Sequence, residues 1–198
     1  MSPATIFDIQ LVLGYVPWLI CFGVYFWPRL KSMDRVEAQR AIAILHAFRF
    51  FGLVFILPGV VGPDLPAGFA EFAAYGDFAT GLLAILALLT IRARFFFWPL
   101  VLAYNIVGIV DLFVDYYHGT VFNLAALSGQ LAATYVIPIV YVPLLMITHF
   151  AALYLLVRPQ SNPARAHGSD SAVVDGIPAA EQTMLRQGAI RNSIDRCR

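Results

Sequence analysis

Five apolar runs of about 20 residues each constrain this chain more than any other feature of its sequence. Such a run is typical of a transmembrane helix, because about 20 helical residues cross the hydrocarbon core of a bilayer. Of the 198 residues, 60% are apolar and 13% are charged, whereas a soluble domain is about half apolar and about a quarter charged. We therefore expect an all-α polytopic transmembrane bundle, with spans near residues 7–27, 42–61, 69–90, 96–117 and 133–157.

The distribution of Lys and Arg predicts the orientation of these spans. The first and third connecting loops and the segment after the fifth span contain basic residues: Arg29, Lys31, Arg35, Arg40, Arg92, Arg94, Arg158 and Arg165. The second and fourth loops, residues 62–68 and 118–132, contain none. Because cytoplasmic loops are richer in Lys and Arg, this alternation places the N-terminus outside and the C-terminus in the cytoplasm. We expect a multi-pass protein of the cell membrane, which is the inner membrane in a Gram-negative bacterium.

The chain changes character after the fifth span. Residues 158–198 are rich in Pro, Ser, Gly and charge, and such a composition cannot bury enough apolar surface to offset the entropy of ordering. We therefore expect residues 1–157 to form the bundle and residues 158–198 to form a disordered cytoplasmic tail. The stretch 120–132 is too polar to cross a bilayer alone, which favours an interfacial helix or an extension of the fifth span.

Acidic side chains inside the third and fourth spans indicate a polar site. Ionisable groups at such positions cost about 2.5–3.5 kcal/mol each on insertion scales. Asp111, Asp115 and His118 recur at i, i+4 and i+7, so they lie along one stripe of a helix. Asp77 falls at about the depth of Asp111 and shares its helix face with small residues, which turns it toward a neighbouring helix rather than toward lipid.

Two carboxyl groups at one depth on adjacent helices allow two functional interpretations. They could share a proton, because two like charges in a poorly solvated site repel each other. They could instead bind a cation or a metal ion, with His118 as a further ligand beside Asp111 and Asp115. A structural alternative for Asp77 and Asp111 is hydrogen bonding to Thr80, Asn105 or a tyrosine, which would hold the helices together. For Asp115 and His118 the alternative is a hydrated position at the membrane interface.

A second polar group is predicted nearer the cytoplasmic side. His46 and Arg49 share a helix face at i and i+3, and His149 lies at a similar depth in the fifth span. Two histidines of one leaflet on different helices could be the axial ligands of a b-type haem. Alternatively, His46 and Arg49 extend to cytoplasmic headgroups, and His149 bonds to a backbone carbonyl. We expect no acid at the level of Arg49, so its charge should face water, a phosphate or an anionic ligand.

The two polar groups would together form a ladder across the bilayer, which is typical of proton or ion paths. The sequence therefore favours binding or transport of a small solute or a proton at Asp77 and Asp111. Three alternatives stay open: a haem-binding electron-transfer subunit, a non-catalytic accessory subunit of a larger membrane complex, and an intramembrane enzyme that acts on a lipid.

Motifs and net charge limit the remaining function classes. The chain has no Gly-rich phosphate loop and no HExxH, GxSxG or CxxC pattern, so a catalytic role has no support from known motifs. A formal net charge of +1 argues against a nucleic-acid partner, which requires a strongly basic surface. The expected partners are the lipid bilayer and either other membrane subunits or a second copy of the chain.

Overall fold

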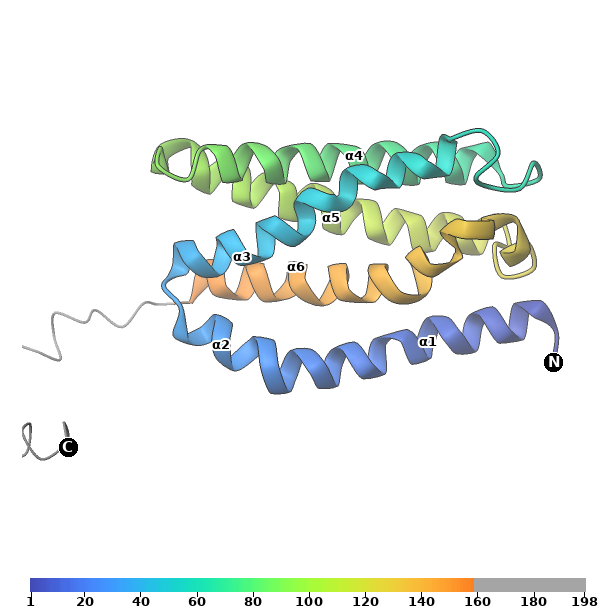
Figure 1. The fold of residues 1–198 in the computed structure, drawn as a ribbon, viewed down its shortest axis with the longest axis horizontal. Helices are drawn as coiled ribbons and strands as arrows, with labels where there is room; N and C mark the ends of the chain where they lie inside the picture. The colour runs from blue at the N-terminus through green and yellow to red at the C-terminus, as the bar shows by residue number, and fades with distance from the viewer. Residues whose placement is uncertain (159–198) are drawn as a thin grey trace, which may run out of the picture. The chain divides into compact units, whose positions relative to one another are not determined.

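The computed structural model describes residues 1–158, and these residues fold into helices joined by short connections (Figure 1). Five helical segments are long and apolar enough to cross a membrane: Pro3–Ser32, Arg35–Ile56, Ala67–Leu89, Arg94–Val121 and Ile137–Val157. The predicted all-α class and the number of five apolar helices are therefore confirmed for this part of the chain. The expectation of a disordered tail concerns residues outside the described range.

Three of the five segments change helix type along their length. The first consists of α1 (Pro3–Cys21), the π-helix η1 (Phe22–Phe26) and α2 (Trp27–Ser32). The second consists of α3 (Arg35–Ala47) and the 3₁₀ helix η2 (Phe48–Ile56). α4 (Ala67–Leu89) and α5 (Arg94–Val121) are single α-helices. The 3₁₀ helix η3 (Ser128–Tyr135) precedes the last segment, which consists of the π-helix η4 (Ile137–Tyr141) and α6 (Val142–Val157).

Successive segments run antiparallel, so their connections lie at two opposite ends (Figure 1). We call one of them the loop end; it contains the N-terminus, residues 57–66 and residues 122–136. The other, the basic end, contains residues 33–34, residues 90–93 and the end of α6. Within residues 1–158, every Lys and Arg except Arg49 lies at or near the basic end.

The second segment begins earlier than the sequence predicts. The charged stretch before residue 42 is expected to be a loop, whereas α2 continues to Ser32 and α3 already starts at Arg35. Asp34 is the N-cap of α3, and its carboxylate accepts hydrogen bonds from the backbone N–H groups of Val36 (2.8 Å) and Glu37 (3.1 Å). These bonds satisfy N–H groups that have no partner within the helix, so the helix begins here. Every residue of this segment therefore lies farther from the basic end than predicted.

The stretch 120–132 is neither one interfacial helix nor an extension of the fifth span. α5 continues to Val121, a turn follows, and η3 begins at Ser128. Asn123 (φ 51°) and Ala132 (φ 45°) lie in the left-handed region of backbone conformation, where helices of L-residues do not continue. The stretch 120–132 is therefore interrupted at Asn123 and at Ala132. The turn of residues 122–127 lies at the loop end.

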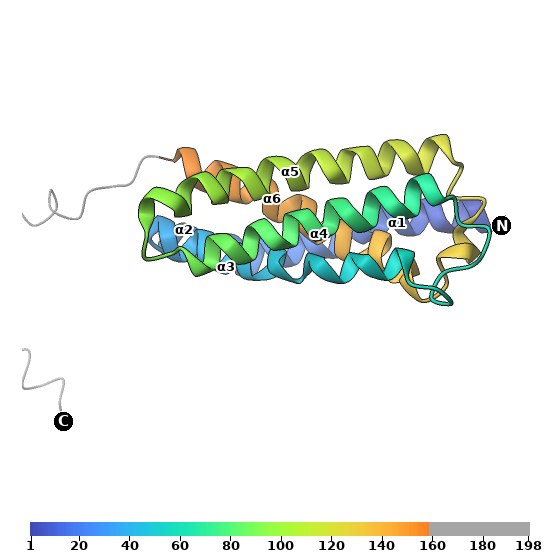
Figure 2. The ribbon, with the colours of Figure 1, turned by 90° about the horizontal axis from the view of Figure 1, so that it is seen from above.

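Apolar clusters occupy the two ends of the bundle and leave a polar layer between them. Near the loop end, the buried side chains include Phe7, Phe55, Phe69, Ala73 and Leu131. Near the basic end, a second cluster contains Ala43, Ala84, Ala87, Phe97 and Val101. α4 lies alongside α5, and the second segment contacts α4 along both α3 and η2 and contacts α6 through α3 (Figures 1 and 2). The junction of α3 and η2 is therefore enclosed by α4, α5 and α6.

Candidate functional site

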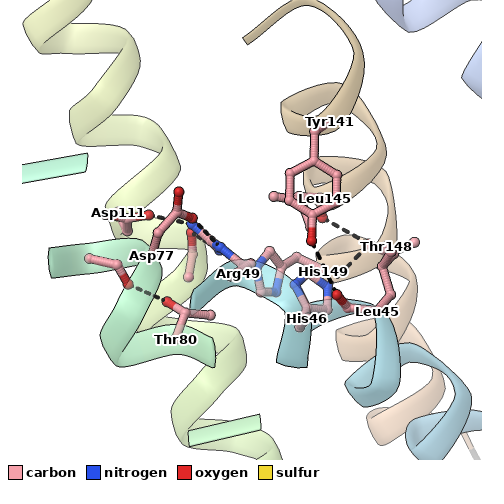
Figure 3. A network of polar contacts seen from close by, with 12 residues as sticks. Leu45, His46, Arg49, Asp77, Thr80, Asp111, Tyr141, Leu145, Thr148 and His149 are labelled. Atoms are coloured by element: carbon pink, nitrogen blue, oxygen red, sulfur yellow. Dashed lines mark hydrogen bonds and ion pairs between the residues drawn. The ribbon is translucent and has the colours of Figure 1, made fainter. Parts of the chain in front are cut away.

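Arg49 is the centre of a buried ionic network at the junction of α3 and η2 (Figure 3). Its side chain is fully buried. Nε donates a hydrogen bond to Oδ1 of Asp77 on α4 at 2.6 Å, and Nη2 donates to Oδ2 of Asp111 on α5. Nη1 lies 3.1 Å from Nε2 of His149 on α6. One guanidinium group thus connects four helical segments, and both carboxyl groups are almost completely removed from solvent.

The network contradicts the prediction that Arg49 has no acid at its own level. The sequence places the acids and the His–Arg group at different depths, whereas Arg49 binds Asp77 and Asp111 directly. The error comes from the start of the second segment at Arg35 rather than near residue 42. Those additional helical residues raise Arg49 by about 10 Å, at 1.5 Å per residue, which is enough to bring it to the acids.

The hydrogen bonds determine the protonation of His149. Because a guanidinium group only donates, Nε2 of His149 must accept from Arg49. Nδ1 of His149 lies 3.0 Å from Oδ1 of Asn105, and the amide nitrogen of Asn105 donates to the Val101 carbonyl at 2.8 Å. The amide oxygen therefore accepts, so Nδ1 carries the proton and the imidazole is neutral.

His46 stacks on His149 and holds the opposite tautomer. The two ring centroids are 3.9 Å apart. Nε2 of His46 lies 3.1 Å from the hydroxyl of Thr148, which also lies within 3.0 Å of the Leu144 and Leu145 carbonyls. The Leu144 carbonyl is the nearest acceptor, at 2.8 Å, so we assign the single hydroxyl proton of Thr148 to it, and Nε2 of His46 then donates to the hydroxyl oxygen. Nδ1 of His46 is then a buried acceptor without a hydrogen-bond partner among residues 1–158.

The stacked imidazoles do not fit the predicted haem ligation. Two axial histidines hold the iron between them, so the porphyrin plane must pass between their rings. The rings of His46 and His149 are in contact, and Arg49, Asn105 and Thr148 bind three of their four nitrogen atoms. These residues therefore have no room for a haem in this arrangement.

Three glycines make room for the charged groups: Gly52, Gly76 and Gly108. A Cβ atom at Gly52 would collide with the carboxyl group of Asp77, and one at Gly76 would collide with that of Asp111. A Cβ atom at Gly108 would collide with the His149 ring and lie 2.7 Å from Nη1 of Arg49. Each glycine lies within three residues of a charged member of the network along the chain. That spacing is the sequence signal that could have identified Gly52 and Gly76.

A cavity of about 300 Å³ extends from the network to the loop end. Asp77 and Asp115 line its inner part, and the exposed residues Asp8, Thr120 and Asn123 line its outer part. The remaining lining is mostly apolar and comes from α1, η2, α4, α5, the residues after α5, η4 and the first residue of α6: Phe7, Leu11, Phe55, Phe69, Ala73, Leu112, Tyr116, Gly119, Leu124, Ala125, Ile137, Pro138 and Val142. The network is therefore accessible from one end of the bundle.

The other predicted site residues lie outside the ionic contacts. Asp115 is on the face of Asp111 but accepts no hydrogen bond through its buried Oδ1 from any described residue. The hydroxyl of Thr80 donates to the Gly76 carbonyl within its own helix at 2.9 Å. His118 contacts the rings of Phe72 and Phe122 rather than an acid. Within residues 1–158, no group of three or more His, Cys, Asp or Glu side chains is arranged to hold a metal ion.

The network contains more acidic than basic groups. Among residues 1–158, Arg49 is the one cation in contact with the two carboxyl groups, so it compensates one of them. A second carboxylate without a counterion would be strongly unfavourable at this level of burial. The arrangement can therefore take up one further positive charge, either as a proton on a carboxyl group or as a cation beside it.

Five apolar helical segments around a buried ionic network, with a cavity that reaches one end, define a small helical bundle with the composition of multi-pass membrane proteins. The chain belongs to the family described as a domain of unknown function, DUF8737, which matches residues 6–157. The match includes every residue of the ionic network. No curated protein and no solved structure matches the chain.

Proposed function

We propose that this chain is a multi-pass membrane protein that binds a proton or a small solute at Asp77 and Asp111 and transports it across the membrane. The observation that carries the proposal is the shared guanidinium of Arg49, which compensates one of two buried carboxyl groups, and one of these groups, Asp77, lines the inner end of a cavity. Ionisable groups buried among apolar helices are expensive, and they mark substrate or proton pathways in membrane proteins.

The outer surface of the bundle supports location in a membrane. Large apolar side chains of α4 and α5 point away from the core and are exposed, among them Leu82, Leu86, Leu102, Ile106 and Val110. Such a surface is unfavourable in water but matches the hydrocarbon core of a bilayer. In the proposed orientation, the basic end and the C-terminus lie in the cytoplasm and the loop end lies outside, because Lys and Arg collect on the cytoplasmic side.

Buried polar atoms between the network and the basic end support passage in that direction. Nδ1 of His46, the hydroxyl of Tyr104 and Oε1 of Gln39 are buried and have no hydrogen-bond partner among the described residues. Gln39 precedes Arg49 by about 15 Å along the second segment, at 1.5 Å per residue. Buried polar atoms are normally satisfied, so these three atoms offer acceptors and donors to a proton or a water molecule between Arg49 and the basic end.

Irregular helix geometry next to the site supports a change of conformation during transport. η2, which includes Arg49, is a 3₁₀ helix of nine residues, whereas 3₁₀ runs longer than 3–4 residues are uncommon and often mark a hinge. η4, which contributes Ile137 and Pro138 to the cavity, is a π-helix directly before the start of α6. Both irregular segments can therefore rearrange around the ionic network.

Proton flux in proteoliposomes tests the proposed function. The wild-type chain should acidify the lumen after a pH jump, as measured with an entrapped pH-sensitive dye, and Asp111→Asn should abolish this flux. Asp115→Asn, which breaks no ion pair within the described residues, should lower the flux. Glu71→Gln changes an exposed acid at the same end and should leave the flux unchanged. Wild-type flux equal to that of empty liposomes, or flux unaffected by both Asp variants, would overturn the proposal.

A further inference from the structure

The ionisable groups that line the cavity select against an anion. Asp8, Asp77 and Asp115 face it, and no Lys, Arg or His lines it within the described part of the chain. Arg49 lies behind Asp77 and uses its guanidinium nitrogens on Asp77, Asp111 and His149. An entering solute therefore meets carboxyl groups and not the guanidinium.

The inner carboxyl groups have oxygen atoms available for a ligand. Asp77 is 6% exposed and lines the cavity. It accepts from Arg49 through Oδ1, and its Oδ2 accepts no hydrogen bond from residues 1–158. Oδ1 of Asp115 is likewise without a partner in that range. Two carboxyl groups with available acceptors provide a site for an ammonium group, which has three donors and no acceptor.

The cavity walls suit the apolar part of a ligand. Phe7, Phe55, Phe69 and Tyr116 contribute aromatic side chains, and several aliphatic residues complete the lining. Aromatic faces attract cations, and apolar walls stabilise an alkyl or aryl group by removing it from water. A volume of about 300 Å³ is at the lower limit of ligand pockets, which measure about 300–1,000 Å³. The cavity therefore suits one small molecule.

We propose that this cavity binds an amphiphilic amine in its protonated form. The ammonium group lies at Asp77 and Asp115, and the apolar group lies against the aromatic side chains near the loop end. This inference rests on the proposed function and names the class of solute. The bound cation supplies the positive charge that the network accepts beside Arg49. A carboxyl group that holds a proton in the free protein then releases it to solvent, so amine binding and proton release are coupled.

A free amine fits the cavity better than the ammonium headgroup of a phospholipid. The phosphate of such a headgroup is next to its ammonium group, and the described lining offers no basic side chain to pair with it. Both sources share the ammonium chemistry, so the experiment must separate them.

Binding of matched six-carbon probes to the purified full chain in dodecyl maltoside tests the inference. Hexylammonium, hexanol and hexanoate have the same apolar group and differ in the charge of the polar one. Hexylammonium should raise the melting temperature and bind in calorimetric titrations, hexanol should bind at least about tenfold more weakly, since a charged hydrogen bond is lost, and hexanoate should not bind. In a weakly buffered solution with a pH dye, hexylammonium binding should acidify the medium.

Variants locate the site. Asp115→Asn should weaken hexylammonium binding at least about tenfold, and Glu71→Gln should leave it unchanged. Equal binding of hexanol and hexylammonium, or an unaltered affinity in Asp115→Asn, would overturn the inference.

If phosphatidylethanolamine, but not phosphatidylglycerol, raises the melting temperature and blocks hexylammonium, the occupant is a lipid headgroup and the free-amine proposal is wrong. Proton flux that depends on Asp111 without amine binding would refute this inference alone and leave the proposed function standing.

Discussion

Arg49 and Asp77 form a hydrogen-bonded ion pair of 2.6 Å between η2 and α4; Arg49 is completely buried, and Asp77 is buried except where it lines the cavity. Asp111 occupies the other edge of the same guanidinium group. Such a buried group of one guanidinium and two carboxyl groups is held together by charge compensation, because an ionised group that loses its hydration recovers the loss only from its partners. The stability of the bundle and the chemistry of the site therefore depend on the same three side chains.

Removal of the cation alone should be more harmful than removal of all three charges. Arg49→Met leaves two buried carboxyl groups without a counterion and should lower the free energy of unfolding by about 3–5 kcal/mol. The triple variant Arg49→Met/Asp77→Asn/Asp111→Asn removes the uncompensated charges and should recover at least half of that loss. Denaturation in mixed micelles of dodecyl maltoside and SDS, followed by circular dichroism, measures both values.

Arg40→Met is the matched control for this comparison. Arg40 pairs with Glu37 at 2.7 Å, but both side chains are about half exposed, so its loss should cost less than about 1 kcal/mol. A triple variant less stable than Arg49→Met would show that charge compensation does not hold the network together.

Substitution of Gly108 should disturb the network without removing any of its groups. In Gly108→Ala, the new Cβ meets the His149 ring and Arg49, and overpacking of this kind costs about 1–3 kcal/mol. Gly23→Ala is the control, since a Cβ at Gly23 meets nothing within 4 Å and alanine favours a helix by about 1 kcal/mol over glycine. The melting temperature in detergent should therefore fall for Gly108→Ala and stay equal or rise for Gly23→Ala. An equal decrease in both variants would contradict the close approach of Gly108 to His149 and Arg49.

The sequence alone predicts the helices of this protein better than their relative heights. Apolar runs of membrane-spanning length identify five segments, because length and hydropathy are properties of each run by itself. The pairing of Arg49 with the acids depends on where the second segment begins, and a charged amphipathic start such as Arg35–Arg40 resembles a loop by composition. Asp34 is a residue type that commonly caps helix N-termini, and it caps α3. A helix predicted to start at this residue would have placed Arg49 level with Asp77 and Asp111.

The contacts of the histidines and glycines required the three-dimensional arrangement. His46 and His149 lie at similar depths by sequence, but only the crossing of the second segment against α6 brings their rings to 3.9 Å. Gly52 and Gly76 become informative once the opposing side chain is known, because a small residue in a helix has many structural explanations. The cavity likewise depends on the turn after α5, whose left-handed Asn123 no apolar pattern predicts.

Cysteine labelling should establish the proposed orientation. In a chain with Cys21→Ser and Cys197→Ser, a cysteine introduced as Asp64→Cys lies at the loop end and one introduced as Ala93→Cys lies at the basic end; both positions are exposed. If the basic end faces the cytoplasm, a membrane-impermeant maleimide should label Asp64→Cys in intact cells and Ala93→Cys only after permeabilisation. The reverse pattern would place the cavity on the cytoplasmic side.

The two stacked histidines should show opposite tautomers at neutral pH. His149 accepts from Arg49 through Nε2 and donates to Asn105 through Nδ1, whereas His46 donates to Thr148 through Nε2. Nitrogen-15 NMR of histidine-labelled protein distinguishes protonated from unprotonated ring nitrogens, and His149→Gln and His46→Gln assign the signals by removing one set each.

Asn105→Asp places a carboxylate at Nδ1 of His149 and should favour the imidazolium, which cannot accept from Arg49. We therefore expect a doubly protonated His149 in that variant and a lower melting temperature than in Asn105→Leu. A proton on Nε2 of His149 in the wild-type protein would show that the guanidinium does not donate to His149, and an unprotonated Nε2 of His46 would show that Thr148 donates to His46.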